Sequence, residues 1–460
     1  MYNTLAQTVF QNTFKSNYQM AEKLKKALGL IPLTFYGVGT IVGAGIYAII
    51  GVVAGEAGYN MWVAFVFTTI AATFSAISYA ELSSTFPKAG AEYVFLSNAF
   101  PKKKVIPFIT GYFITIHGTA TFATVLLAFA GYFSGFIDIP EMLIAYALLA
   151  VITLFNLSGI KKSSVVNITF TSAQILGLVM LVVAGITSPD FGNVFQHKFS
   201  LGSEIFTSVA IVFYVYTGYE HMATLAEEAK NPGRNIPLAF IFSLVFTTVI
   251  YLLIVFSALA LATPEALASS GSPLALAGSN RYSWMGPVIG VAALLATANV
   301  SLSASLSVSR MMYGMASKGD MPAMLSKLNK QQAPWLAALV LAAIVGLFIP
   351  FGQIKLVASV SSLGAMLVFA FVNLAVIVLR YKHPTLKRPF SVPLRIGKFP
   401  VLPAFGVIVS GLLATQFTWE VYLIFGIAVT LGITGYYLSS GKNSAAANSN
   451  DPEKVWGDEH

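Results

Sequence analysis

The chain has 460 residues, of which 56% are hydrophobic and 10% are charged. A soluble domain carries about a quarter of its residues as Asp, Glu, Lys or Arg, so this composition excludes an ordinary soluble protein and indicates an integral membrane protein. The chain contains no cysteine, which excludes a thiolate metal site, a cysteine nucleophile and a disulfide-linked accessory subunit.

About twelve stretches of the chain are long and apolar enough for a helix to cross the hydrocarbon core, which takes about 20 residues. Their length, and the absence of a period-two alternation, favour helices over the strands of an outer-membrane barrel. We therefore predict an all-α integral membrane protein. The predicted spans are residues 31–54, 61–84, 105–134, 139–157, 164–187, 204–226, 236–262, 286–312, 334–350, 354–380, 398–416 and 419–439.

The positive charges lie mainly on one side of these spans. All of the 27 Lys and Arg residues except Lys198, Arg281 and Lys355 fall in the segments on the side of the N-terminus. Cytoplasmic loops carry an excess of Lys and Arg, so we predict a multi-pass protein of the cell membrane with both termini cytoplasmic and an even number of spans. A missed pair of spans would keep this parity. The net charge of +9 is thereby explained by orientation and does not indicate a nucleic-acid partner.

Polar segments flank the apolar part of the chain. Residues 1–30 are predicted to be a cytoplasmic N-terminal segment, because no short apolar region with a cleavage site precedes the first span. Residues 440–460 are rich in Ser, Asn and Asp, and we predict a disordered cytoplasmic tail there.

The first span contains a glycine-rich run around Gly43 and Gly45, where the backbone can leave the helix at modest cost. Backbone groups exposed in this way are tolerated in a membrane only where they line a cavity or bind a ligand. A packing role is the alternative, because Gly39 and Gly43, like Gly51 and Gly55, form the spacing that lets two helices approach closely.

The sixth span carries a second interruption. Gly218 lies near its middle, and the carboxylate of Glu220 follows two residues later. Interrupted segments at matching places in two halves of a chain indicate the midplane site of a transporter. The N-termini of the half-helices attract an anionic group, and the freed carbonyl groups accept from an ammonium group. A zwitterionic amino acid needs both, and an intramembrane carboxylate such as Glu220 indicates function.

Four motifs, in order along the chain, resemble the amino acid–polyamine–organocation superfamily. Residues 211–238 are similar to its sixth-helix signature, in which an aromatic-rich helix breaks before a glycine and a charged run follows. The other three motifs are Ile41 to Ile46, Ala80-Glu81-Leu82 with residues 87–93, and residues 309–322.

This resemblance implies the leucine-transporter type of fold, with two inverted five-helix repeats at 31–187 and 204–380 and two additional helices at 398–439. It also implies that the substrate carboxylate lies near Gly43, Ala44 and Gly45. The substrate ammonium would meet the carbonyls of Ile41, Val42 and the break at Tyr216, Thr217 and Gly218. Tyr214 would stand as an aromatic gate, and Glu220 would be a further substrate contact.

One position departs from the proton-coupled members that the chain resembles. They carry a lysine in the fifth helix where this chain has Gln174, and an amide cannot titrate. Proton coupling through that position is then absent. Sodium bound near Gln174 with the hydroxyls of Ser301 and Ser303, a proton carried by Glu220, and exchange without an ion are the open alternatives.

The sequence predicts a secondary amino acid transporter that works by alternating access. Its aromatic pocket with one acid favours a neutral or aromatic amino acid, and a cationic amino acid or polyamine held by Glu220 is the alternative. An exchanger and a transporter-like sensor are further possibilities. No catalytic constellation and no phosphate-binding GxxxxGK[ST] run is present, so we expect no enzyme activity and no cofactor. The expected partners are the amino acid, membrane lipid and a coupling proton or sodium ion.

Overall fold

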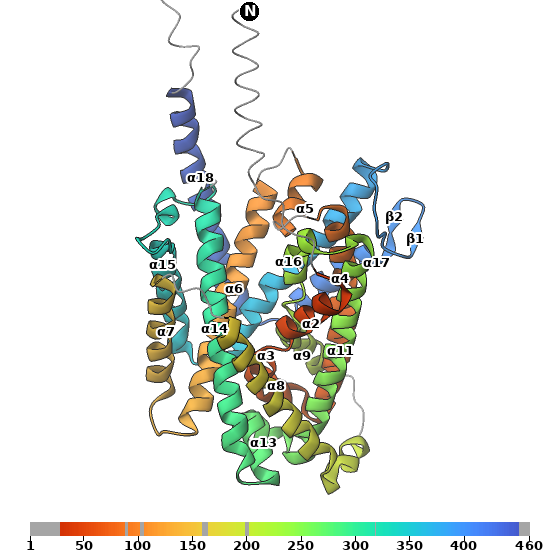
Figure 1. Cartoon of the computed structure of the whole chain (residues 1–460), viewed down its shortest axis with the longest axis vertical. Coiled ribbons are helices and arrows are strands. Elements are labelled where there is room, and N and C mark those ends of the chain that lie inside the picture. The colour runs from red at the N-terminus through yellow and green to blue at the C-terminus, as the bar shows by residue number, and fades with distance from the viewer. Residues whose placement is uncertain are drawn as a thin grey trace, which may run out of the picture.

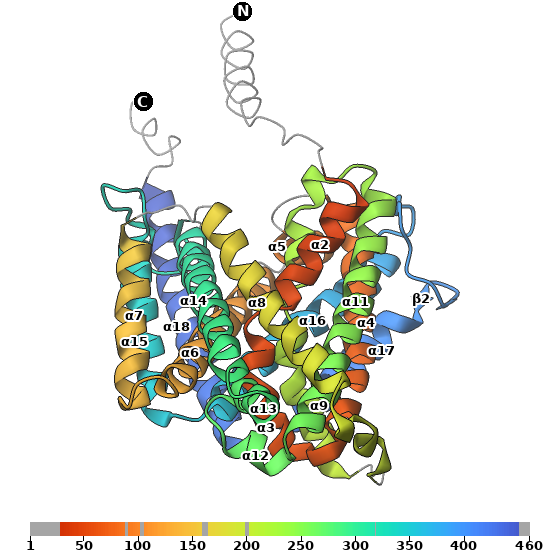
Figure 2. The ribbon, with the colours of Figure 1, turned by 60° about the horizontal axis from the view of Figure 1, so that its bottom comes forward.

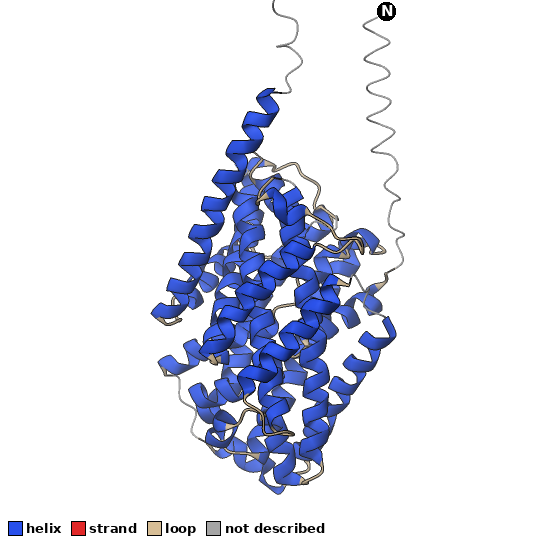
Figure 3. Cartoon of the chain, turned by 90° about the vertical axis from the view of Figure 1, so that its left-hand side faces the viewer, coloured by secondary structure: helices blue, strands red, loops and turns tan. Residues whose placement is uncertain are grey.

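The computed structural model describes residues 28–87, 91–101, 105–158, 164–197, 202–317 and 319–449. These residues are almost entirely helical (Figures 1 and 3). The longer helices are α2 Leu30–Ile41, α3 Gly45–Ala57, α4 Met61–Thr85, α6 Val105–Ser134, α7 Glu141–Leu157, α8 Ser164–Ile186, α9 Ser203–Tyr216, α11 Pro232–Leu261, α14 Met285–Ser317, α15 Trp335–Phe348, α16 Ile354–Lys382, α17 Val401–Ala414 and α18 Trp419–Ser449.

Shorter elements connect these helices. They are the helices α5 Ala91–Ala99, α10 His221–Thr224, α12 Pro264–Ser269 and α13 Pro273–Arg281, and the 3-10 turns Gly58–Asn60, Pro189–Gln196, Ala226–Glu228, Ala323–Ser326 and Ile349–Phe351. One small hairpin pairs β1 Arg395–Ile396 with β2 Phe399–Pro400. In Figure 1, α5 and the hairpin lie toward the upper end of the bundle and α13 lies at the lower end.

A helix occupies each of the predicted spans. Within the described residues, seven helical stretches are long and apolar enough to cross a membrane, and four shorter apolar helices accompany them. This confirms a multi-pass all-α membrane protein, whereas the count of twelve crossings stays a prediction. The upper end in Figure 1 holds the loops rich in Lys and Arg, so it is the end predicted to face the cytoplasm.

The helices repeat a pattern along the chain. Elements at the same place in the two sets of five pack against each other: α3 against α9, α4 against α11, α6 against α14, and α7 against α15. Non-spanning helices also recur at the same place, α5 after α4 near the upper end and α12 with α13 after α11 near the lower end (Figures 1 and 2). The additional helices α17 and α18 both pack on α16. This arrangement agrees with the leucine-transporter type of fold expected from the sequence.

The predicted tail differs from the structure in one part. Helix α18 continues to Ser449, so residues 440–449 have helical backbone where the sequence predicts disorder. A helix that has already formed extends at one hydrogen bond per added residue, and the run Ala445-Ala446-Ala447 has a high helix propensity. The other predicted polar segments, residues 1–27 and 450–460, lie outside the described residues.

The glycine pairs of the first span have different surroundings. A Cβ on Gly51 would lie 2.6 Å from the carbonyl oxygen of Leu267, and one on Gly55 would lie 3.1 Å from Ala268 Cβ. Both glycines therefore let α12 approach α3 closely, as the packing alternative expects. Gly39 has no atom within 4 Å of the same position, and Gly43 has only Val300 of α14, at 3.6 Å, as a side-chain neighbour. Close packing accounts for the second pair and not for the first.

Candidate functional site

The first span is broken between α2 and α3. The chain leaves the helical conformation at Val42, whose ψ is 70°, and the amide of Gly43 turns back to donate to the carbonyl of Ile41 at 2.7 Å. At 12 and 13 residues, α2 and α3 each reach about 18 to 20 Å, too short to cross a core of about 30 Å alone. No side chain among the described residues caps the start of α3, so the positive end of this helix has no side-chain acceptor.

The sixth span is broken after α9. Thr217 is extended, with φ −68° and ψ 152°, and Gly218 has a φ of +119°, which other residues rarely adopt. The amide of Gly218 donates to the Glu220 carboxylate at 2.7 Å, and the Thr217 hydroxyl donates to the carbonyl of Tyr214 at 2.7 Å. Glu220 thus stabilises the break, as the N-terminal neighbour of the four-residue helix α10.

The two breaks meet. A Cβ on Gly218 would lie 2.5 Å from the carbonyl oxygen of Thr40, so the backbones of the two broken helices touch at these residues. Tyr251 of α11 joins them from the other side, because its hydroxyl lies 2.7 Å from the carbonyl oxygen of Ile41 and 3.1 Å from that of Val215. Tyr251 is fully buried, so these contacts are protected from water.

Gln174 of α8 also contacts the first break. Its side-chain amide donates to the carbonyl oxygen of Val42, and its backbone carbonyl oxygen accepts from the Tyr47 hydroxyl at 2.9 Å. The carbonyls of Ile41 and Val42, which the family resemblance assigns to the substrate ammonium, therefore already accept hydrogen bonds from the protein in this conformation.

Apolar side chains surround the start of α3. A Cβ on Gly45 would lie 3.3 Å from Val215 Cγ1 and 3.5 Å from Tyr214 Cε1, so Tyr214 stands beside the first break. Ala44 is fully buried. Tyr216 points elsewhere, since its ring packs on Phe65 and Tyr251. Of Tyr214 and Tyr216, Tyr214 is therefore the one placed against the glycine run.

The predicted sodium ligands do not fit one ion in this arrangement. Ser301 and Ser303 are two residues apart in the continuous helix α14, so their side chains project about 160° apart, on nearly opposite faces, and cannot both face Gln174. The Ser303 hydroxyl donates to its own helix at Asn299, and Ser301 is fully buried without a hydrogen-bond partner in the described residues. With the carbonyls of the first break also occupied, we derive no step through a sodium ion. The described residues contain no cluster of three His, Asp or Glu suited to a transition metal.

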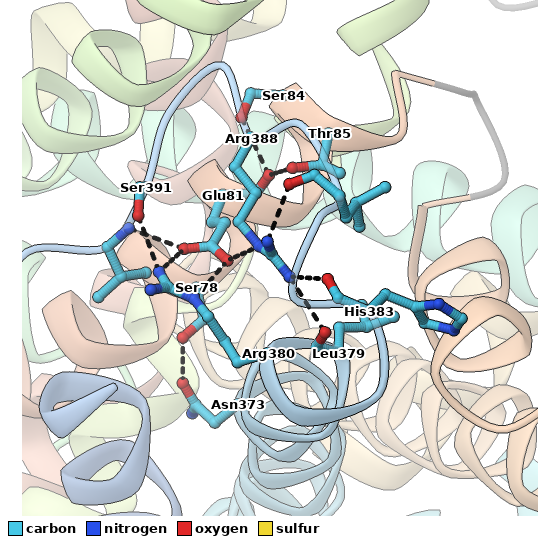
Figure 4. A network of polar contacts seen from close by, with 12 residues as sticks. Ser78, Glu81, Ser84, Thr85, Asn373, Leu379, Arg380, His383, Arg388 and Ser391 are labelled. Atoms are coloured by element: carbon cyan, nitrogen blue, oxygen red, sulfur yellow. Dashed lines mark hydrogen bonds and ion pairs between the residues drawn. The ribbon is translucent and has the colours of Figure 1, made fainter. Parts of the chain in front are cut away.

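A second polar cluster lies at the upper end of the bundle, where α4 ends (Figure 4). The buried Glu81 carboxylate accepts from Arg380 of α16 at 2.5 and 3.2 Å, and from Nε of Arg388 at 3.1 Å. The amide of Val392 donates to the same carboxylate at 2.7 Å. Burial lowers the pKa of Arg388 and the nearby Glu81 charge opposes this shift. One carboxylate thus faces two guanidinium groups.

Sequence reasoning missed this cluster. It counted Arg380 and Arg388 among the charges that set orientation, and Glu81 appeared there only within a family motif. A carboxylate inside the predicted span 61–84 was the one available signal, because such a group needs a partner.

Comparisons with known proteins identify the family of this chain. The amino acid permease family matches residues 28–443. The branched-chain amino acid permease of Bacillus subtilis (strain 168) is 29% identical over 92% of this chain and 95% of its own length. The methylthioribose transporter of the same organism is 27% identical over the same shares of the two chains. A vacuolar cationic amino acid transporter of Arabidopsis thaliana is 30% identical over 79% of this chain and 64% of its own. With two helix breaks joined at a buried centre and a family match over nearly its whole length, the chain belongs to the amino acid permeases of the amino acid–polyamine–organocation superfamily.

Proposed function

We propose that this permease is a secondary transporter of neutral amino acids, and that the substrate binds where the two helix breaks meet. The contact of Gly218 with the carbonyl of Thr40, together with the link through Tyr251, carries this proposal. Both breaks supply backbone groups to one buried place, and irregular backbone at membrane depth is tolerated where it binds something.

The two ends of an amino acid find complementary groups there. The uncapped start of α3 at Ala44 and Gly45 offers amide groups and a positive helix end to the carboxylate, and the amide of Gly43 joins them when it releases the carbonyl of Ile41. The ammonium group faces the carbonyls of the second break at Tyr216 and Thr217 and the carboxylate of Glu220. The carbonyls of Ile41 and Val42 also accept from the ammonium group when Tyr251 and Gln174 share or release their hydrogen bonds to these carbonyls.

The surroundings support a neutral substrate side chain. Val215, Val300 and Tyr214 are the side chains nearest to Gly43 and Gly45, and all three suit an aliphatic or aromatic group. The Bacillus subtilis relative is named for branched-chain amino acids. A cationic amino acid is the second candidate, favoured by Glu220 and by the Arabidopsis thaliana relative named for cationic amino acids.

The packing of the first span supports alternating access. Helix α2 packs mainly on α11 and α10, and Ile31, Phe35 and Tyr36 are exposed on its other side. Helix α3 packs on α4, α6, α9, α12, α13 and α16, and its lower end is tied to α16 by the ion pair of Glu56 with Lys355. We infer that this conformation is closed at the lower end and opens at the upper end.

The test measures the melting temperature of the purified protein with each of the twenty amino acids, because a ligand that binds the folded form raises it. We expect a few neutral amino acids to do so. Gly43→Ala should weaken their binding by about tenfold or more, since a methyl group there obstructs the carboxylate. The protein itself tolerates this methyl, whose one side-chain neighbour would be 3.6 Å away.

Gly39→Ala is the matched control, one helical turn earlier, where a methyl group meets nothing within 4 Å. It should bind like the unchanged protein. Equal binding by both variants would place the site elsewhere, and a shift with cationic amino acids alone would replace the neutral substrate by the second candidate.

A further inference from the structure

The segment between α16 and α17 concentrates positive charge at the upper end of the bundle. Residues 380–398 contain six Lys or Arg residues, and the chain has no Asp or Glu between Asp320 and Glu420. Any acidic partner for these cations must therefore come from another part of the molecule. Within the described residues, Glu81 of α4 is the one carboxylate that pairs with them.

A cavity of about 280 Å³ opens in this segment, between the end of α16 and the hairpin of β1 and β2. Four cations line it: Arg380, Arg388, Arg395 and Lys398, together with Ser391. The side chains of Arg380 and Arg388 are only 7% and 10% exposed, so the inner wall is held rigidly by the Glu81 cluster (Figure 4).

The positive charge of the cavity is not balanced. Glu81 neutralises one of the two buried guanidinium groups, and the side chains of Arg395 and Lys398 make no ion pair or hydrogen bond in the described part of the chain. Arg380 uses Nε and Nη2 for Glu81 and Ser391, which leaves its Nη1 donors without a partner among the described residues. A guanidinium edge beside other cations suits a phosphate group.

The hairpin that borders the cavity has the composition of a membrane-interface element. It projects sideways from the bundle beside α17 in both Figure 1 and Figure 2. Leu394 and Ile396 are 65% and 75% exposed and flank Arg395, and Lys398 follows two residues after Ile396. Apolar side chains next to Lys and Arg favour the boundary of acyl chains and headgroups, where the apolar groups enter the lipid and the cations meet phosphate.

We propose that this cavity binds the phosphate of an anionic phospholipid headgroup from the leaflet at the upper end. Arg380, Arg395 and Lys398 donate to the phosphate oxygens, and Leu394 and Ile396 lie against the acyl chains. Free phosphate has the same chemistry at the cations, but it does not account for the exposed apolar residues of the hairpin. Basic pockets at the ends of membrane helices are suited to such headgroups.

The experiment titrates the full-length protein, in neutral detergent, with phosphatidylglycerol, phosphatidylcholine and inorganic phosphate, and records the melting temperature and the bound lipid by native mass spectrometry. We expect phosphatidylglycerol to bind and to stabilise, and the other two to do neither at the same concentration. In the double variant Arg395→Gln, Lys398→Gln the half-saturating concentration should rise roughly 10- to 30-fold. Both residues are exposed, so the fold is retained.

The double variant Arg310→Gln, Lys327→Gln is the matched control. It removes two exposed cations near the same end of the bundle but outside the cavity, and it should bind phosphatidylglycerol like the unchanged protein. Equal weakening in both double variants would overturn the proposal, because it would show attraction to the whole charged end. Stabilisation by inorganic phosphate at the same concentration would also overturn it and make the cavity a site for free phosphate.

Discussion

Glu220 combines two properties at the junction of the broken helices. Its carboxylate accepts from the backbone amide of Gly218 at 2.7 Å, and it is an ionisable group beside the proposed substrate site. Gln174, at the place where similar proton-coupled proteins carry a lysine, holds the carbonyl of Val42 with an amide that cannot titrate. We therefore propose that a coupling proton is carried by Glu220.

The variant Glu220→Gln tests this proposal. A glutamine oxygen can still accept from the amide of Gly218, so the break is retained while the titrating group is lost. We expect uptake by the unchanged protein in proteoliposomes to rise with an inward proton gradient. In the variant, uptake with and without the gradient should agree within about twofold, whereas substrate should still raise the melting temperature.

Glu92→Gln provides the control. Like Glu220, Glu92 has a carboxylate that accepts a hydrogen bond from within the protein, in its case from the hydroxyl of the buried Tyr79 at 2.9 Å. Its uptake should respond to the gradient like that of the unchanged protein. A gradient response that survives in Glu220→Gln would remove Glu220 from the coupling role. If uptake by the unchanged protein and by both variants depended on amino acid inside the proteoliposomes and not on pH, the protein would be an exchanger.

The sequence predicts the two helix breaks but not the side chains that hold their backbone in place. Gly43, Gly45 and Gly218 are visible because a backbone that leaves a helix needs residues of their kind. Tyr251 is not, since it lies 210 residues from the carbonyl of Ile41 that it contacts. Gln174 is reached only through the family resemblance, and its hydrogen bond to the carbonyl of Val42, 132 residues away, is not predicted. A tyrosine in an apolar helix gives no sign of such a distant acceptor.

Among the elements, α11 has a particular role as the support of both broken helices. It packs along α2, and its Tyr251 hydroxyl contacts Ile41 and Val215 at once. Tyr251→Phe should lower the melting temperature, because it leaves buried carbonyl groups short of a donor at about 1–3 kcal/mol. It should also slow uptake, since the two breaks lose their common contact. Thermal unfolding and uptake by the same preparation measure both effects.

The comparison for Tyr251→Phe is Tyr132→Phe, the same change at another buried tyrosine. Its hydroxyl contacts lie at 3.4 Å, to the carbonyl of Tyr47 and the amide of Leu274, so they are weaker. The loss of stability should be smaller there and uptake should be retained. An equal effect of the two changes would mean that Tyr251 is an ordinary packing residue.

The positions of the helices are predicted well because long apolar runs determine them. Each predicted span coincides within a few residues with one helix, or with two helices in the broken first and sixth spans. The predictions about helix ends were wrong where features other than the apolar pattern decide them. Arg380 ends an apolar run and was read as a loop charge, whereas it turns inward to the Glu81 carboxylate. Helix α18 extends past residue 440 because helix propagation outlasts the apolar pattern.

For the whole molecule, the orientation in the membrane follows from charge alone and is directly testable. The chain has no cysteine, so a single introduced thiol reacts without background. Lys327→Cys lies in an exposed loop on the side predicted to be cytoplasmic, and Gly192→Cys lies in an exposed turn on the other side. A membrane-impermeant maleimide should label Gly192→Cys in intact cells and Lys327→Cys only after permeabilisation. The reverse result would invert the orientation, and labelling of both in intact cells would contradict the assignment of these loops to opposite sides.

The attachment of α2 at both of its ends has a mechanical consequence. At the break it is held by Tyr251, and just before its start Leu28 exchanges backbone hydrogen bonds with Glu228 and Lys230, which follow α10. Helix α2 and the segment that follows α10 are therefore coupled, and we expect them to rotate together about the break. A helix of 12 residues is about 18 Å long, so a rotation of about 20° at the break moves the far end of α2, with the segment bonded to it, by about 6 Å. A rotation that small leaves the hydrogen bonds within α2 intact, so the contacts that change are those at the break and the packing of α2 on α11.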